Sequence, residues 1–129
     1  MNKVFFIVDD DPFFCKLIQG KFSENDVTVK SFSTGEECLK SLDEDPDLII
    51  LDYIFSSVDT KYKDGMAIFE AIKEYSADIP VIMLSGQEDG EIVLALARKG
   101  VSDYVVKDKD VISALEEAIS NVMIDNSIN

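Results

Sequence analysis

The sequence predicts an α/β fold, with a parallel five-stranded sheet covered by helices on both faces. Apolar residues repeat with a helical period in the stretches between five short apolar runs. Strand and helix therefore alternate along the chain, and this alternation is typical of a doubly wound parallel sheet with right-handed crossovers. The five runs that we expect to form strands are residues 3–8, 27–32, 47–51, 79–84 and 102–107.

The apolar runs also indicate where each strand lies in the sheet. The runs at 3–8, 47–51 and 79–84 are nearly continuous in apolar residues. Such runs suit central strands that are buried on both faces. The runs at 27–32 and 102–107 alternate more between apolar and polar residues, as edge strands do.

The predicted helices carry recognisable start and stop signals. Asp11 suits the N-cap of the first helix, with Pro12 at the first helical position. A Ser or Thr cap and an early acidic turn open the helix at 33–42. Basic residues followed by Gly100 mark the end of another helix. The helices predicted after the second are residues 64–75, 88–100 and 109 to about 124.

Length and composition favour one globular domain. A chain of 129 residues with 47% hydrophobic residues can bury one core, and no linker or repeat divides it. We therefore expect a single domain over residues 1–129, with its core at about 3–124 and a frayed tail over 125–129.

Charge and residue usage exclude several classes of function. The net charge of −14 disfavours binding of nucleic acid or of an anionic membrane through the chain's own surface. The absence of histidine excludes histidine-ligated metals and a phosphohistidine on this chain. The two cysteines, Cys15 and Cys38, are expected to pack in the core. No run approaches the ~20 apolar residues of a membrane span, and the first run is too short for a signal peptide, so we expect a cytoplasmic protein.

Polar side chains gather where the predicted strands end. The carboxyl ends of parallel strands share one edge of the sheet, and function collects there. Clustered carboxylates repel, by on the order of 3 kcal/mol per pair at ~5 Å and an effective dielectric of ~20. A hard cation such as Mg²⁺ would relieve this repulsion, and a metal, an ammonium and a hydroxyl together suit phosphoryl transfer to a carboxylate nucleophile. The residues concerned are Asp9, Asp10 and Asp11 after the first strand, Asp52 after the third, Ser85 after the fourth and Lys107 after the fifth.

At these residues the chain resembles the receiver domain of response regulators in two-component signalling. The resemblance covers about residues 3 to 124 and is carried by "VDD", "LIILD", "IMLS" and "DYVVK", in the family's order. Tyr104, three residues before Lys107, matches an aromatic switch position of the family. The resemblance implies a flavodoxin-like (βα)5 sheet with strand order 2-1-3-4-5.

The resemblance also implies a metal site and a phosphoacceptor. Asp52 would take a phosphoryl group from a phosphohistidine on a partner, either a histidine kinase or a histidine phosphotransfer protein. Asp10 and Asp52 would ligate Mg²⁺ directly, Asp9 mainly through water, and the backbone carbonyl of Ile54 would complete the protein ligands. Such a domain has phosphotransfer and autodephosphorylation chemistry without being a conventional enzyme.

Further roles implied by the resemblance concern switching and partners. Ser85 and Lys107 would bind phosphoryl oxygens. Ser85 and Tyr104 would then move and remodel the face formed by the fourth helix, the fifth strand and the fifth helix. We also expect a downstream target protein, and a chain that is either a monomer or a weak phosphorylation-dependent dimer. The Phe13 end of the first helix resembles the surface on which kinases dock.

Two segments depart from the family pattern. Twelve positions separate Asp52 from Asp64, several more than is usual, so the loop over 53–63 is either a tolerated surface insertion or a partner-specific contact or flap. Lys107 is followed by Asp108 where the family usually has proline, often in a cis bond. A cis bond without proline costs ~3 kcal/mol. The loop is therefore either trans and rearranged or strained beside the site.

Two other functions remain open on sequence grounds. One is a receiver-like protein-binding module that is never phosphorylated. The other is a haloacid-dehalogenase-like phosphatase with Asp9 as nucleophile and Asp11 as acid. Such enzymes need a further acidic pair beyond the lysine, whereas "KDKDVISALEEA" leads directly into the last helix. The N-cap role already accounts for Asp11, so this residue needs no catalytic function.

Overall fold

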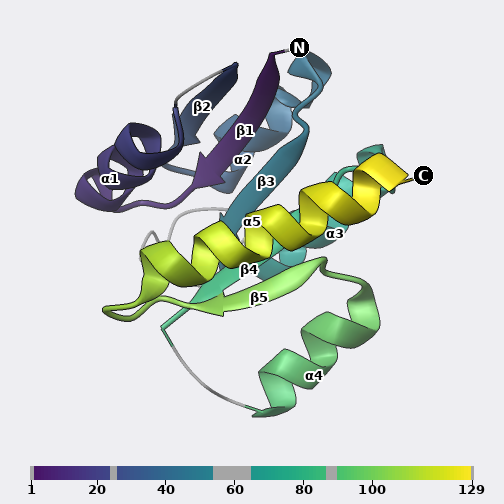
Figure 1. Cartoon of the computed structure of the whole chain (residues 1–129). Coiled ribbons are helices and arrows are strands. Elements are labelled where there is room, and N and C mark those ends of the chain that lie inside the picture. Colours follow the sequence, from purple (N-terminus) through teal and green to yellow (C-terminus); the bar gives the residue numbers. More distant parts are fainter. Residues whose placement is uncertain (1, 24–25, 54–64, 87–89, 129) are drawn as a thin grey trace.

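A computed structural model describes residues 2–23, 26–53, 65–86 and 90–128, and side chains are described up to 123 with a further gap at 90–92. Its described part contains one five-stranded parallel sheet in the order β2-β1-β3-β4-β5 (Figure 1). This confirms the predicted fold and strand order. The strands are β1 (Lys3–Val8), β2 (Val27–Phe32), β3 (Leu48–Asp52), β4 (Val81–Ser85) and β5 (Asp103–Val106).

Helices connect successive strands. The last helix extends to Ile128, four residues beyond the expected end, so residues 125–128 are helical where we expected a frayed tail. The absence of Gly and Pro from this stretch leaves the helix without a stop signal. The helices are α1 (Pro12–Phe22), α2 (Gly35–Lys40), the 3₁₀ turn η1 (Leu42–Glu44), α3 (Gly65–Tyr75), α4 (Gly90–Lys99) and α5 (Val111–Ile128).

The sheet separates two hydrophobic cores. Helices α1 and α5 pack on one face, where Ile18 and Leu115 are fully buried. Helices α2, α3 and α4 pack on the other face, where Ile68 and Leu96 are fully buried. Each such side chain contributes about 1.5–3 kcal/mol by leaving water. Burial on both faces explains why β3 and β4 are buried at every position.

The cysteines and the first helix cap are as predicted. Cys15 lies in the core beneath α1 and Cys38 in the core beneath α2, and both thiols are free. The Asp11 carboxylate accepts hydrogen bonds from the backbone N–H groups of Phe13, at 3.0 Å, and Phe14, at 3.3 Å. Pro12 occupies the first position of the helix. The sequence "DDDP" therefore ends a strand and starts a helix within four residues.

Within the described chain, no helix is both long enough and apolar enough to cross a lipid bilayer.

Candidate functional site

The predicted site residues lie at the carboxyl edge of the sheet. Asp52 ends β3 and Ser85 ends β4. Strand register pairs Asp52 with Leu84, so Ser85 lies one position beyond Asp52 on the neighbouring strand. The backbone N–H of Lys107 donates to the Ser85 carbonyl at 2.8 Å. Parallel pairing thus brings the ends of three strands to one place, as the sequence predicts.

Three carboxylates converge at this edge. Asp9, Asp10 and Asp52 each offer a carboxylate oxygen, and these oxygens lie within 4.8 Å of one another. Asp9 and Asp52 are buried, with exposed fractions of 1% and 7%. A cluster of hard oxygen donors, in a chain without histidine, matches the ligand preference of Mg²⁺. The residues present therefore fit the metal that the family implies.

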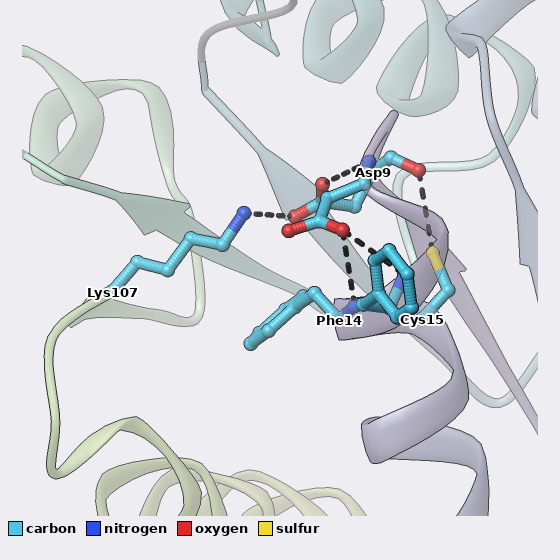
Figure 2. Close-up of polar contacts among 6 residues, drawn as sticks. Asp9, Phe14, Cys15 and Lys107 are labelled. Carbon is cyan, nitrogen blue, oxygen red and sulfur yellow. Dashed lines mark hydrogen bonds and ion pairs between the residues drawn. The ribbon is translucent and has the colours of Figure 1, made fainter.

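Asp9 is held in place from three directions (Figure 2). One carboxylate oxygen accepts from the Asp11 backbone N–H at 2.9 Å, and the other accepts from the Lys107 ammonium at 2.6 Å. The Cys15 thiol donates to the Asp9 backbone carbonyl at 3.3 Å. These contacts fix both the main chain and the side chain of Asp9. Burial of the Cys15 thiol, and after it the charge of Asp9, raises the pKa of this thiol to about 11.

Lys107 carries a positive charge into the acidic cluster. Its side chain is 25% exposed, and its ammonium lies 4.4 Å from the centre of the Phe14 ring. Partial burial alone lowers the pKa of this ammonium. The hydrogen bond to Asp9 and the surrounding carboxylate charges outweigh burial, so the net pKa lies above its ordinary value. Lys107 is thus a stable cation at this edge.

The segment after Lys107 resolves one alternative that the sequence left open. No peptide bond among the described residues is cis, so the bond from Lys107 to Asp108 is trans. The Asp108 N–H donates back to the Val106 carbonyl at 3.0 Å. The Asp108 carboxylate accepts from the Asp110 N–H at 2.9 Å. A tight hydrogen-bonded turn therefore replaces the lysine–proline step that is usual in the family.

The structure describes Ser85 and Tyr104 but not Ile54. Ser85 is buried, and Tyr104 is partly buried against the core on the α3 side of the sheet. Ile54, predicted to lend a backbone carbonyl to the metal, lies outside the described residues, as does almost all of the long loop. The two ends of that loop meet, because the Gly65 N–H donates to the Tyr53 carbonyl at 2.5 Å.

Sequence reasoning missed two contributors to the site. Phe14 lies among the apolar residues of α1, and nothing in their periodicity indicates contact with Lys107. Gly65 packs its α-carbon against the chain at Asp52 and Tyr53: a Cβ there would lie 2.5 Å from the Asp52 carbonyl oxygen and 2.6 Å from the Tyr53 Cα. A glycine at the start of a helix indicates only weakly that another backbone segment packs against its α-carbon.

Comparison with known proteins identifies the family. The family model described as "Response regulator receiver domain" matches residues 5–120. The alkaline phosphatase synthesis transcriptional regulatory protein PhoP of Bacillus subtilis is 32% identical over 109 residues, which cover 83% of this chain and 43% of PhoP. The DNA-binding transcriptional regulator NtrC of Escherichia coli is 25% identical over 92% of this chain and 25% of its own length. The chain thus spans less than half the length of these curated relatives.

Solved structures agree with this assignment. The structure titled "BeF3 Activated DrrB Receiver Domain" superposes with a TM-score of 0.80 at 28% identity, over 95% of this chain and 98% of that one. The receiver domain of the Francisella response regulator 1452 gives a TM-score of 0.78 at 25% identity, over 98% of each chain. The matched family model, the strand order and the carboxylates at the sheet edge lead to one conclusion: the chain belongs to the response regulator receiver domain family.

Proposed function

We propose that this chain is the phosphoacceptor receiver domain of a two-component system or phosphorelay, and that Asp52 accepts the phosphoryl group in a Mg²⁺-dependent reaction. The observation that carries the proposal is the convergence of three carboxylates within 4.8 Å, with the Lys107 ammonium bonded to one of them. A cation-binding group of carboxylates beside a fixed ammonium suits the neutralisation of phosphoryl oxygens.

The reaction proposed is a direct phosphoryl transfer. A carboxylate oxygen of Asp52 attacks the phosphorus of the partner's phosphohistidine, the P–N bond breaks, and the imidazole leaves with its electron pair. Asp9, Asp10 and Asp52 would hold Mg²⁺, which supplies charge neutralisation for the phosphoryl oxygens. Lys107 and the Ser85 hydroxyl would bind the remaining oxygens. The product is an acyl phosphate on Asp52.

The proposed output is a change in the face formed by α4, β5 and α5. Tyr104 of β5 belongs to the same core as Leu96 of α4. Leu96 is the only buried side chain among the α4 residues whose side chains are described, 93–99. Movement of Ser85 and Tyr104 would therefore change the support of α4.

The proposed partner is a histidine kinase or histidine phosphotransfer protein in the cytoplasm. Phe13 is 83% exposed and Leu17 is 53% exposed, although both are large and apolar. They lie one helical turn apart on α1, whose first residue follows the Asp11 cap beside the acidic cluster. This apolar strip suits a partner helix that presents its phosphohistidine to Asp52.

Phosphorylation by a small donor tests the function. The protein is incubated with acetyl phosphate and MgCl₂, and the product is examined by intact mass spectrometry and by peptide mapping after borohydride reduction. We expect one phosphoryl group on Asp52, none on Asp52→Asn, and none when EDTA replaces MgCl₂. A panel of phosphorylated kinases and phosphotransfer proteins would then identify the physiological donor.

The same experiment distinguishes the two alternatives. An unlabelled Asp52 in a folded protein would support the phosphorylation-independent binding module. A label on Asp9 would support the dehalogenase-like phosphatase.

A further inference from the structure

We propose that Phe14 is a positioning residue for Lys107, whose ring holds the lysine ammonium beside the acidic cluster. The inference rests on the proposed function only in so far as Lys107 acts on a phosphoryl group. The ammonium lies 4.4 Å from the ring centre, well inside the ~6 Å within which a cation is attracted to an aromatic face. The same ammonium donates to Asp9 at 2.6 Å, so ring and carboxylate hold it together.

The ring is itself held in place. Phe14 is 8% exposed and belongs to the core cluster beneath α1 and α5. Its backbone N–H donates to the Asp11 cap at 3.3 Å, so the first turn of α1 fixes the residue that bears the ring. Lys107, by contrast, follows an edge strand and reaches the site on a flexible four-carbon stem. The rigid partner therefore positions the flexible one.

The ring and the carboxylate differ in how they respond to a cation. Asp9 belongs to the set of residues that fits Mg²⁺, and a bound cation neutralises much of its attraction for the ammonium. A phenyl ring coordinates no metal, so its attraction for the ammonium persists. Phe14 would thus keep Lys107 at the site when the carboxylates bind Mg²⁺.

Three variants separate this role from simple packing. Phe14→Leu removes the ring and keeps an apolar side chain, and Phe14→Tyr keeps the ring. Phe22→Leu makes the same change at the other end of α1, where Phe22 packs partly buried against the same core. Should Phe14→Leu fail to fold, Phe14→Met, with an unbranched and adaptable side chain, takes its place.

NMR of the Lys107 side chain is the primary measurement, made with and without MgCl₂. We expect the ring to shift the Lys107 Cε protons upfield in the parent, in Phe14→Tyr and in Phe22→Leu, and the shift to disappear in Phe14→Leu. The rate of Asp52 phosphorylation at saturating acetyl phosphate should fall about three- to tenfold in Phe14→Leu alone, with little change in the donor concentration for half-maximal rate.

The outcomes are distinct. An unchanged Lys107 shift in Phe14→Leu overturns the proposal, whether or not the phosphorylation rate changes. Loss of the shift with an unchanged rate also overturns a positioning role in transfer. If the parent protein accepts no phosphoryl group, the proposed function fails, while the Lys107 shift with and without MgCl₂ still decides whether Phe14 holds the ammonium.

Discussion

The Lys107 ammonium donates a 2.6 Å hydrogen bond to the Asp9 carboxylate, although the two residues are 98 positions apart. They follow β5 and β1, which are not neighbours, since β3 and β4 lie between them. The bond therefore spans the carboxyl edge of the sheet and brings the last strand into contact with the acidic cluster. It also places a positive charge against one of the carboxylates that fit a cation.

Removal of this positive charge should strengthen Mg²⁺ binding. Lys107→Gln removes the hydrogen bond from the ammonium to the Asp9 oxygen and the repulsion between the ammonium and the cation. Because solvent and salt partly screen this repulsion, we expect the affinity for Mg²⁺ to rise about three- to tenfold. Isothermal titration calorimetry measures the affinity. Lys109→Gln, which removes an exposed lysine two residues away, should change it little. Equal affinities of parent and Lys107→Gln would contradict the prediction.

Alanine at Gly65 should disturb β3 where it ends at Asp52. The added Cβ would lie 2.5 Å from the Asp52 carbonyl oxygen, and backbone atoms cannot rotate away as a side chain can. We expect Gly65→Ala to lower the free energy of unfolding by about 1–3 kcal/mol in urea denaturation and to slow Asp52 phosphorylation.

Gly20 provides the matched control for Gly65. It lies within α1, and a Cβ there meets nothing within 4 Å. Gly20→Ala should therefore stabilise the protein by about 0.5–1 kcal/mol, because alanine has the higher helix propensity. A loss of stability in both variants would show that close packing at Gly65 is not the cause.

Cys38 should make the fold sensitive to alkali. Burial raises the pKa of its thiol to about 12, from 9.0 for an exposed thiol. Because the folded pKa is raised, the stabilisation is complete below pH 9, and it is lost as pH rises from about 9 through about 12. This thiol alone should lower the free energy of unfolding by up to about 1.4 kcal/mol per pH unit in that window.

Denaturant unfolding at several pH values measures this dependence. Cys38→Ala removes the titrating thiol, so its stability should fall less steeply between pH 9 and 12 than that of the parent. Below pH 9 the two curves should run parallel. Parallel curves over the whole range would exclude the thiol as the source.

A glycine at position 45 should stabilise the C-terminal end of the 3₁₀ turn η1. Asp45 is the C-cap of η1 and adopts a left-handed backbone conformation, with φ of 57°. This conformation costs a non-glycine residue about 1–2 kcal/mol, less for Asp, so Asp45→Gly should raise the free energy of unfolding by about 0.5–1 kcal/mol. Asp43→Gly, within the same turn, should have no such benefit. Thermal unfolding of both variants provides the comparison.

The sequence by itself determined the fold and the principal residues of the candidate site. Apolar runs of strand length identified every strand of the sheet, and their alternation placed β2 and β5 at its edges. Because parallel strands place their carboxyl ends together, the position of Asp9, Asp10 and Asp52 in the chain was sufficient to predict that they converge. The cap at Asp11 could be predicted in the same way, because aspartate is a preferred N-cap residue and a helical pattern follows it directly.

Only the tertiary structure decided how these groups pair. That Lys107 bonds to Asp9, that it lies over the Phe14 ring, and that its peptide bond to Asp108 is trans could not be read from the chain. Sequence patterns report local periodicity and the order of the strands. The partner of a long flexible side chain depends on packing between segments far apart in sequence, here α1 and the end of β5. At this site, that packing determines which carboxylate and which ring hold the charge of Lys107.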